Sequence, residues 1–463
     1  SKFGSRDCVR LNFSHGTQED HRKLFNLVKS LSVKYQHQVS IMCDIQGPKI
    51  RTGRMEKPFE IRAGEKIDVT PEDVLGTPQL IQIKYATMLK DLDAGDVIFI
   101  NDGIIKLTVE SKSEKALHCV CNAGGQISDR KGCNIPSGNI SLDVVTPKDD
   151  KDLQLIAELN PEYVASSFIG TAEDVLKVKK VLAGYGNTNI KIISKIERPV
   201  ALENIDAIIE VTDGLMVARG DLGVEIDTWD VPSAQKMLCQ KANAAGKPVI
   251  VATQMLESMT QNSRPTRAEA NDVYNAVLDG ADAVMLSGET ATGKYPIAAI
   301  QVMDKIVEAA EGHMPERLST NFLSTKVGMT ETIALSVYET AKNFTRIGRK
   351  CKIIVITYPP SAYTARMVSK FRPPADVITI TSDLRIAREI NLLWGVRSVH
   401  FPELSEENNM EVRNLTAIKK LIEVGLVQLD NYVICVSRSL FGKHTGACSN
   451  VYCLPVLKEE GLL

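Results

Sequence analysis

Three charged residues follow two apolar, β-rich runs in the middle of the chain. The run 190–195 ends in Lys195, with Glu197 two residues later, and the run 214–218 precedes Asp221. Two carboxylates that flank an anionic substrate are typical ligands of a hard divalent ion, above all Mg²⁺ with several retained waters. Lys195 beside them would offer a positive charge to a phosphoryl oxygen or an enolate. The alternative is an ordinary surface salt bridge between Lys195 and Glu197.

A second group of polar residues, Arg10, Asn12 and Ser14, lies in and directly after the first apolar run of the chain. Alternate side chains of a β-strand lie on one face, so these three would point the same way. Arg10 can bind a phosphate or a carboxylate through two parallel hydrogen bonds. Asn12 and Ser14 supply neutral oxygen atoms suited to a monovalent or divalent cation. A polar layer inside a barrel, or a helix N-cap at Ser14, would explain the same residues.

The third group lies in the segment 44–51, directly after the next apolar run. Asp44 adds another carboxylate, and Lys49 and Arg51 make the loop basic, which suits a nucleotide phosphate. A Gly-Pro pair predicts a turn within the loop. An ordinary charged surface loop is the alternative.

A repeated pattern of elements must position these groups. Short β-rich runs, each followed by an amphipathic stretch, occur at 8–12, 39–44, 163–167, 190–195, 214–218, 248–253 and 283–287. Alternating strands and helices predict a parallel sheet. Seven units favour a (β/α)8 barrel of the TIM type whose first βα unit is absent from the chain, and we expect that unit upstream. In such a barrel all strands end at one mouth, where the three groups would meet.

The helix expected after the first run illustrates the pattern. Apolar residues at positions i, i+3, i+4 and i+7 predict it, and they are Leu24, Leu27, Val28 and Leu31. Thr17 with Asp20, and Thr266 with Glu269 before a later helix, resemble capping boxes.

Two blocks interrupt the repeat. The segment 56–144 contains short alternating runs punctuated by Gly and Pro, which predicts a small inserted β domain. After residue 315 a new set of strands and helices predicts a separate α/β domain. We therefore expect a catalytic barrel at 1–55 and 145–315, an inserted β lid at 56–144, and a C-terminal α/β domain at 316–463. A length of 463 residues fits three domains.

Composition excludes several functional classes. The chain has 55 basic and 57 acidic residues, so a formal net charge of −2 gives no general reason to bind nucleic acid or an anionic membrane. We expect neither a membrane span nor a signal peptide, because no apolar stretch is long enough. Ten cysteines in a chain of this length do not indicate a disulfide scaffold. We expect reduced core thiols and a cytoplasmic protein.

The three groups, in this order, resemble the pyruvate kinase family. The resemblance extends from about residue 8 to the C-terminus. It is carried by RLNFSHG at 10–16, ISKIE at 193–197, MVARGDLG at 216–223, ATQMLESM at 252–259 and LSGET at 286–290. The family architecture is a barrel, an inserted β lid and a C-terminal regulatory α/β domain, as expected above.

The resemblance implies a glycolytic kinase that transfers a phosphoryl group from phosphoenolpyruvate to ADP, giving pyruvate and ATP. The implied ligands of Mg²⁺ or Mn²⁺ are Glu197 and Asp221. The implied catalytic residues are Lys195, Thr253 and Arg10. The implied substrate-binding residues are Lys195, Gly220, Asp221, Thr253 and Ser287. The implied nucleotide contacts are Asn12, His15, Arg51, Lys131 and Asp102.

One departure from the family concerns its monovalent cation. The common family loop has the sequence DTKGPE and uses K⁺, whereas residues 44–49 here are DIQGPK. The implied cation site consists of Asn12, Ser14, Asp44 and Ile45. Lys49 replaces the glutamate that helps to balance K⁺, and its ammonium group could take the role of the cation. We therefore expect activity that does not require K⁺.

The C-terminal domain departs as well. Many members bind a sugar bisphosphate there, but the loop 357–362 contains two prolines, which remove two N–H donors. We expect no binding of fructose bisphosphate. The basic loop 437–444 could take another phosphorylated effector, or could be an ordinary solvated loop. The resemblance also implies an allosteric homotetramer.

Two other functions stay open at this point. Family members usually begin with a further strand, containing TIGP, and a helix, which this chain lacks. A catalytically impaired paralogue or isoform could therefore serve as a regulatory subunit. A barrel lyase or aldolase acting on phosphoenolpyruvate is the other alternative, although the lid, Arg51 and Lys131 favour a nucleotide substrate.

Overall fold

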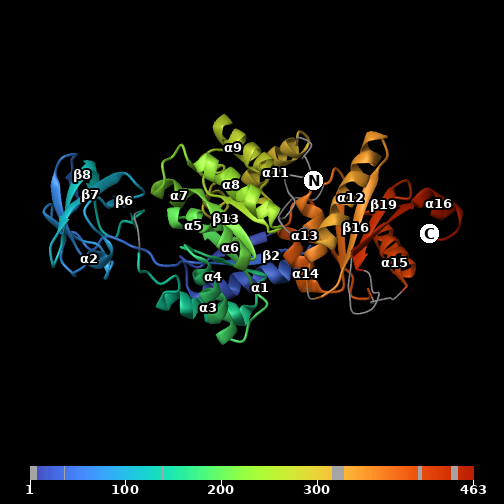
Figure 1. The fold of residues 1–463 in the computed structure, drawn as a ribbon, viewed down its shortest axis with the longest axis horizontal. Coiled ribbons are helices and arrows are strands. Elements are labelled where there is room, and N and C mark those ends of the chain that lie inside the picture. Colours follow the sequence, from blue (N-terminus) through green and yellow to red (C-terminus); the bar gives the residue numbers. More distant parts are fainter. Residues whose placement is uncertain are drawn as a thin grey trace.

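The seven apolar runs form one parallel sheet whose strands lie side by side in sequence order. The structure is a computed structural model that describes residues 8–35, 37–136, 140–314, 328–359, 361–404, 409–438 and 447–463. Figure 1 shows this sheet at the centre of the molecule. Its strands are β1 (Cys8–Asn12), β2 (Ser40–Ile45), β11 (Tyr163–Ser166), β12 (Lys191–Ile196), β13 (Gly214–Ala218), β14 (Val249–Ala252) and β15 (Ala283–Val284). Among the described residues, β1 pairs only with β2 and β15 only with β14. This is the (β/α) sheet of seven units that the sequence predicted.

Helices cover the outer face of this sheet. They are α1 (Gln18–Lys34), α3 (Pro147–Leu159), α4 (Ala172–Gly184), α5 (Pro199–Glu203), α6 (Ile205–Val211), α7 (Arg219–Glu225), α8 (Val231–Ala244), α9 (Arg267–Asp279), α10 (Gly288–Ala291) and α11 (Pro296–Glu311). The two predicted capping boxes, at Thr17 and Thr266, are both present. No helix in the described part of the chain is long and apolar enough to span a membrane.

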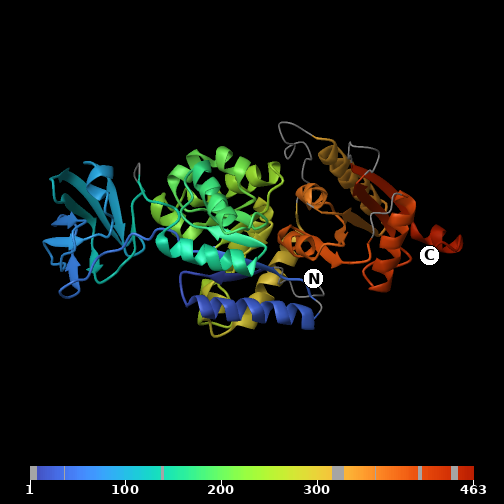
Figure 2. The same cartoon turned by 90° about the horizontal axis from the view of Figure 1, so that it is seen from below.

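Helix α1 lies where the sequence predicted it, but of the four apolar residues expected to face the core, only Val28 packs against it. Leu24, Leu27 and Leu31 are exposed, whereas His21 and Phe25 are buried. The reason is that Phe25 packs into the core while the imidazole of His21 stacks on Phe13, with ring centroids 3.9 Å apart. The helix, which lies along the outside of the central unit (Figure 2), is therefore rotated relative to its leucine residues.

The inserted segment forms two small sheets at one end of the molecule (Figure 1). The larger has the order β10-β6-β7-β8-β4-β5, and the smaller pairs β3 with β9. The elements are β3 (Phe59–Ile61), β4 (Lys66–Thr70), β5 (Leu80–Gln82), α2 (Met88–Asp91), β6 (Val97–Ile100), β7 (Ile105–Lys112), β8 (Leu117–Ala123), β9 (Gly125–Ile127) and β10 (Cys133–Asn134). We call this unit the lid. Its apolar side chains form their own core.

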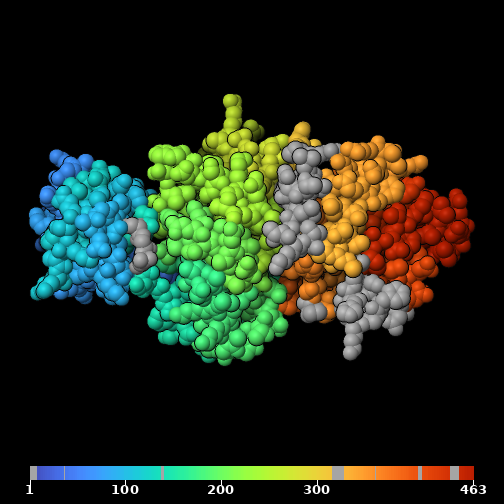
Figure 3. Space-filling view, in the orientation of Figure 1, coloured from blue at the N-terminus to red at the C-terminus, as the bar shows by residue number. Residues whose placement is uncertain are grey.

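The C-terminal part of the chain lies at the other end of the molecule (Figures 1 and 3), and it contains a five-stranded sheet. Its order is β18-β17-β16-β19-β20, with β20 antiparallel to β19 and the other pairs parallel. The elements are α12 (Met329–Arg346), β16 (Cys351–Thr357), α13 (Tyr363–Lys370), β17 (Asp376–Thr381), α14 (Leu384–Glu389), η3 (Ile390–Leu392), β18 (Val396–His400), α15 (Met410–Glu423), β19 (Tyr432–Arg438), β20 (Ala447–Cys453) and α16 (Leu454–Glu459). Leu392 of this unit packs inside the central sheet.

Candidate active site

Side chains alternate between the two faces of each central strand, and this alternation decides which of them lie on the inner face of the curled sheet. Met42 of β2 and Ile193 of β12 belong to the apolar cluster on that inner face. Side chains two residues further on share the same face, so Asp44 and Lys195 also point inward. Both lie near the carboxyl ends of their strands, and Glu197 follows in the same register. We call this end of the sheet the mouth.

Lys195 is the centre of the charged group at the mouth. Its Nζ atom lies 2.8 Å from Glu197 Oε1 and 3.4 Å from Asp44 Oδ1. It also donates a hydrogen bond of 2.7 Å to Ser167 Oγ, directly after β11. The Lys195 side chain is only 12% exposed. The pair with Glu197 therefore exists but is buried, unlike the surface salt bridge considered from the sequence.

The two carboxylates keep Lys195 charged. Burial by itself lowers the pKa of Lys195, but Asp44 and Glu197 outweigh it and hold the pKa above its ordinary value. A buried, permanently protonated ammonium group is suited to neutralising negative charge on a substrate oxygen, because water screens it little.

Glu197 forms an ion pair with Lys195 and also experiences the negative charge of Asp221. Burial raises the pKa of Glu197, Lys195 opposes the shift, and the charge of Asp221 reinforces it. The second carboxylate oxygen, Oε2, accepts a hydrogen bond of 2.9 Å from the Phe168 N–H. A divalent cation between Glu197 and Asp221 would remove their repulsion, so this donor set fits Mg²⁺.

Arg10 is held at the mouth by Asp44. Its Nε atom donates to Asp44 Oδ2 over 2.6 Å, and the Asp44 side chain is almost completely buried. The strands β1 and β2 place the two residues close together, since Arg10 pairs with Met42 and Asn12 with Asp44 in the sheet register. The guanidinium group is thereby fixed beside Lys195.

Thr253 and Gly220 meet on the neighbouring strand ends. The Gly220 N–H donates to Thr253 Oγ1 over 2.7 Å, and this hydroxyl donates to the Ala252 carbonyl over 2.6 Å. Thr253 has a φ of 70° and Gln254 a φ of 53°. Left-handed conformations of non-glycine residues cost free energy and are concentrated at functional sites.

Arg219, which the sequence analysis did not select, supports that strained turn. Its Nη2 atom donates to the Thr253 carbonyl over 2.7 Å, and its Nη1 lies 2.6 Å from Asp272 Oδ1. It begins α7, and Asp221 lies exposed in the first turn of the same helix. The turn at Thr253 and the start of α7 are therefore held as one unit.

The other residues expected on β1 are placed differently from the prediction. Ser14 lies beyond the end of the strand, and its N–H donates to Asn12 Oδ1 over 3.1 Å. The three polar residues therefore do not share one strand face, because a side-chain turn at Asn12 replaces the last strand positions. Thr17, not Ser14, caps the following helix. His15 is exposed beside this turn.

Ser287 and Ile45 lie at the same end of the sheet. Ser287 precedes α10, and its N–H donates to Glu289 Oε2 over 2.7 Å. The Ile45 carbonyl already accepts a hydrogen bond of 2.8 Å from Ser167 Oγ. Ser167, which also accepts a hydrogen bond from Lys195 Nζ, therefore links β2 to Lys195.

Lys49 and Arg51 follow β2 on the way to the lid. The Lys49 residue is exposed, yet partial burial of its ammonium group lowers the pKa of Lys49, and so do the positive charges of Arg51 and Lys195. The negative charges of Asp221 and Glu197 raise this pKa, but by less. The ammonium group thus lies within the electric field of the mouth. Arg51 donates from Nη1 to the Arg130 carbonyl over 3.1 Å.

The lid residues expected near the mouth lie on two of its turns. The Lys131 N–H donates to Thr52 Oγ1 over 2.8 Å, where the chain enters the lid. Asp102 is exposed and has a φ of 55°, next to Gly103. A Cβ atom on Gly103 would lie 3.3 Å from Val224 Cγ1, so this turn rests on α7.

Sequence reasoning missed Ser167 and Phe168. Both follow β11, and a polar residue closing an apolar run was the signal used elsewhere, so Ser167 was within reach. Phe168 could not be predicted, because it contributes only its backbone N–H. Its backbone is left-handed, with a φ of 66°.

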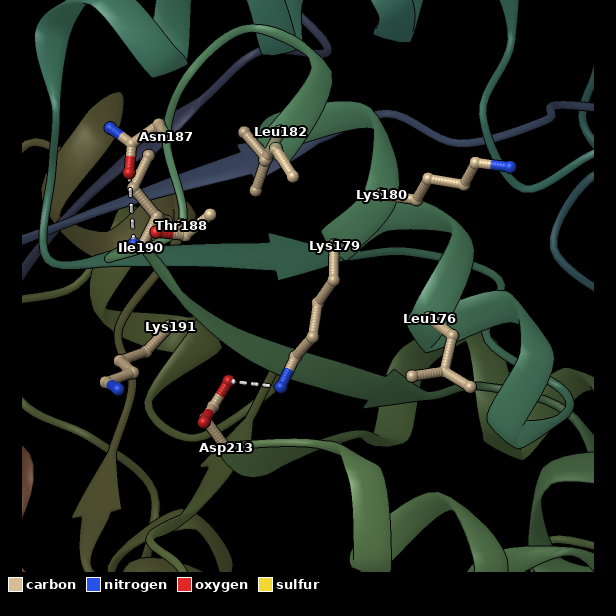
Figure 4. Close-up of a pocket in the computed structure, with 10 residues that line it drawn as sticks. Leu176, Lys179, Lys180, Leu182, Asn187, Thr188, Ile190, Lys191 and Asp213 are labelled. Atoms are coloured by element: carbon tan, nitrogen blue, oxygen red, sulfur yellow. Dashed lines mark hydrogen bonds and ion pairs between the residues drawn. The ribbon is translucent and has the colours of Figure 1, made fainter.

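A cavity of about 410 Å³ lies at the opposite end of the strands from the mouth. Figure 4 shows Lys179 pointing at Asp213 while Lys180 and Lys191 point elsewhere. Lys179 Nζ and Asp213 Oδ2 are 3.0 Å apart. The lysines do not converge, so this cavity is not the candidate active site.

Known proteins provide an independent comparison. A family model described as the barrel domain of pyruvate kinase matches residues 4–300, and one described as its alpha/beta domain matches residues 331–450. A pyruvate kinase of Bacillus licheniformis is 37% identical, covering 98% of this chain and 78% of its own. One of Clostridium acetobutylicum is 40% identical, with coverages of 92% and 89%. A crystal structure of a pyruvate kinase from Cryptosporidium parvum, 35% identical, gives a TM-score of 0.88 and covers 96% of this chain and 90% of that one.

Proposed function

The chain belongs to the pyruvate kinase family of phosphotransferases, and from this premise we propose how its own residues move a phosphoryl group from phosphoenolpyruvate to ADP. The observation that carries the proposal is the buried contact of Lys195 with Glu197 and Asp44 at the mouth. Phosphoryl transfer depends mainly on positioning and charge neutralisation. Lys195 supplies a fixed positive charge for the transferring group and for the enolate left behind.

Five further residues bind and convert the substrate in this proposal. Arg10, oriented by Asp44, binds the phosphate. The backbone N–H groups of Gly220 and Asp221 at the start of α7, with Ser287, bind the carboxylate end. Thr253 supplies the hydroxyl next to the enolate carbon. In this structure that hydroxyl donates to the Ala252 carbonyl, so it must turn before it can take part in protonation.

Glu197 and Asp221 would hold the divalent cation, Mg²⁺ or Mn²⁺. Among the described residues, no three His, Cys, Asp or Glu side chains form a closed metal site. Substrate and water oxygens would therefore complete the coordination, as is usual for Mg²⁺. When bound, the ion neutralises charge on the phosphoryl oxygens.

Lys49 takes the part of the monovalent cation in this proposal. The site assigned to K⁺ comprises Asn12, Ser14, Asp44 and Ile45. The charges of Asp221 and Glu197 already act on the Lys49 ammonium group. A positive charge from Lys49 at that site would make added K⁺ unnecessary.

The nucleotide lies between the mouth and the lid. Asn12, His15 and Arg51 approach it from the barrel side, and Lys131 and Asp102 from the lid. Closing the lid over the mouth would exclude water and limit wasteful hydrolysis.

Regulation belongs to the C-terminal unit in this proposal, within a homotetramer. Thr357 Oγ1 donates to the Ser361 carbonyl over 3.1 Å, so the hydroxyl of Thr357 already has a partner within the loop that would hold a sugar phosphate. We expect fructose bisphosphate to leave the rate unchanged. Residues 439–444 of the other candidate effector loop, 437–444, lie outside the described residues.

The test is pyruvate production from phosphoenolpyruvate and ADP with Mg²⁺, in tetramethylammonium buffer without K⁺. We expect turnover by the wild type and none by Lys195→Met. If the folded wild type is inactive with and without K⁺, the regulatory-subunit alternative replaces this proposal. Turnover that does not need ADP would favour the lyase or aldolase.

The role of Lys49 has its own test in the same assay. We expect K⁺ to change the wild-type rate by less than about twofold, and Lys49→Glu to gain about tenfold from K⁺, because the added carboxylate needs a counter-ion. A tenfold stimulation of the wild type would contradict the idea.

A further inference from the structure

A single guanidinium group binds three acceptors in the turn that follows β14. Arg219 Nη2 donates to the Thr253 carbonyl over 2.7 Å and also to Met255 Sδ. Its Nε atom donates to the Ala252 carbonyl over 3.4 Å. The Arg219 side chain is only 10% exposed. Because an arginine presents its N–H donors as a rigid planar fork, it fixes where these acceptors lie relative to one another.

The same fork is anchored on α8 and α9, which lie next to each other in the central unit (Figure 1). Arg219 Nη1 donates to Asp272 Oδ1 of α9 over 2.6 Å and to Gln235 Oε1 of α8 over 3.3 Å. Gln235 is buried, and its Nε2 atom donates to Asp279 Oδ2 over 2.9 Å. All five N–H donors of Arg219 therefore have acceptors, three in the turn and two on the helices.

The backbone of the turn is strained and needs such support. Thr253 has a φ of 70° and Gln254 a φ of 53°. A β-branched residue such as threonine rarely adopts the left-handed conformation, which persists only where surrounding contacts hold it. The hydrogen bond from Arg219 to the Thr253 carbonyl is a contact of this kind.

The Thr253 hydroxyl, in contrast, has partners that the reaction must displace. It accepts from the Gly220 N–H over 2.7 Å and donates to the buried Ala252 carbonyl over 2.6 Å. In the proposed function the substrate carboxylate takes the Gly220 N–H, and the hydroxyl must leave the Ala252 carbonyl. A buried carbonyl without a donor would oppose that movement, but Arg219 Nε still donates to it. The hydroxyl can therefore change partners while Arg219 keeps the Thr253 backbone in place.

We propose that Arg219 is a positioning residue for protonation of the enolate, because it holds the Thr253 backbone while the hydroxyl turns toward the enolate carbon. Asp272 orients Arg219 in turn. In this step the hydroxyl gives a proton to the carbon, whose C=C electron pair forms the new C–H bond, and takes another from water. The inference rests on the proposed function, which places the Thr253 hydroxyl beside that carbon. Arg219 does not take part in phosphoryl transfer, so the two halves of the reaction should respond differently to its replacement.

Two partial reactions separate these halves. ATP formation in a single turnover, measured by rapid quenching, reports phosphoryl transfer. Exchange of the methyl protons of pyruvate with D₂O, in the presence of Mg²⁺ and ATP, reports protonation in reverse. We expect Arg219→Lys, which keeps the charge and loses the planar fork, to slow the methyl exchange about tenfold and to leave ATP formation within about twofold. Equal slowing of both reactions, or an unchanged methyl exchange, would overturn the proposal.

Asp272→Asn is a milder variant that keeps the size of the side chain and weakens the anchor of Arg219. We expect it to slow the methyl exchange about threefold. Asp206→Asn is the matched control, because it makes the same replacement in an exposed ion pair, 2.5 Å from Lys241 Nζ, and it should change neither reaction. In a Thr253→Ala background, Arg219→Lys should slow the methyl exchange no further. Additive losses would contradict an action through Thr253.

A measurement without substrate separates a failure of this inference from a failure of the proposed function. Backbone amide exchange in the segment 252–256 should quicken in Arg219→Lys and in Asp272→Asn, and stay unchanged in Asp206→Asn. Unchanged amide exchange in both test variants would overturn the inference even if the wild type is an active kinase. An inactive wild type would overturn the proposed function and with it the role in protonation, whereas quickened amide exchange would still show that Arg219 holds the turn.

Discussion

At the scale of single residues, Ser167 sets the position of the charge at the mouth. Its hydroxyl accepts a hydrogen bond from Lys195 Nζ and donates one to the Ile45 carbonyl. The ammonium group is therefore held by a neutral oxygen as well as by two carboxylates. A neutral acceptor fixes direction without cancelling the charge that the substrate needs.

Replacing Ser167 should separate rate from affinity. We expect Ser167→Ala to lower kcat about tenfold, with the KM for phosphoenolpyruvate within about twofold, because one hydrogen bond to a charged group is lost. Ser166→Ala is the matched control, since the buried Ser166 Oγ has no hydrogen-bond partner among the described residues. Steady-state kinetics of both variants decide the matter. Equal losses would show that only packing has changed.

At the scale of elements, one capping residue serves both a helix and the site. Asp149 closes the capping box of α3, where Oδ2 accepts from the Thr146 N–H over 3.0 Å. Its other oxygen, Oδ1, accepts from the Gly47 N–H over 3.1 Å. Gly47 has a φ of 66°, a conformation that glycine adopts without strain. The start of α3 thereby fixes the loop between Asp44 and Lys49.

Asp149→Asn should therefore do more than weaken a helix. An amide can replace only one of the two acceptor oxygens, and the buried site makes an unpaired donor cost about 1–3 kcal/mol. We expect a lower melting temperature and a higher KM for ADP. Asp20→Asn alters the equivalent box of α1, which is exposed, and should leave the KM unchanged. A raised KM in both variants would contradict the argument.

The elements also show how far the sequence alone could reach. The central strands were located within a few residues because each is an apolar run that ends in a polar group. Four lid strands, β3, β5, β9 and β10, could not be located from the sequence because they have only two or three residues, too few to display alternation. The rotation of α1 could not be predicted, since it depends on the stacking of His21 on Phe13.

Some contacts of the candidate site could be predicted from the sequence and others could not. Lys195, Glu197 and Asp44 follow strands of one parallel sheet, so topology alone predicts that they meet. Asn134 Nδ2 of the lid donates a hydrogen bond to Glu225 Oε1 of α7, although the two residues are 91 positions apart and belong to different units. Their contact depends on how the lid lies on α7, for which no local pattern exists.

At the scale of the whole molecule, the C-terminal unit closes the far end of the central sheet. Arg372 Nη1 lies 2.8 Å from Asp282 Oδ1 at the start of β15, and both side chains are buried. The Tyr163 hydroxyl at the start of β11 donates to the Glu389 carbonyl over 2.6 Å. A buried pair of this kind is strongly destabilising to break, because the remaining charge lacks a partner. The central sheet and the C-terminal unit are therefore energetically coupled.

Leu392 provides the sharpest test of that coupling. It belongs to the C-terminal unit by sequence but packs among Met42, Tyr163 and Ile193 inside the central sheet. Its neighbour Leu393 packs in the core of its own unit. Truncating either leucine to alanine should cost about 2–5 kcal/mol, through lost burial and a residual cavity. The total loss of stability therefore cannot distinguish the two variants, but its location can.

For Leu392→Ala we expect faster hydrogen exchange in β11 and β12, where the cavity opens beneath the side chains that lead up to Lys195. Leu393→Ala should quicken exchange in α12 and β16 and leave the central strands protected. If Leu392→Ala also affected only the C-terminal unit, the leucine would be a passive contact. Faster exchange in the central strands would instead mean that the C-terminal unit supplies part of the core that holds the mouth in place. A ligand bound to the C-terminal unit could then change the position of Lys195 through the packed side chains alone.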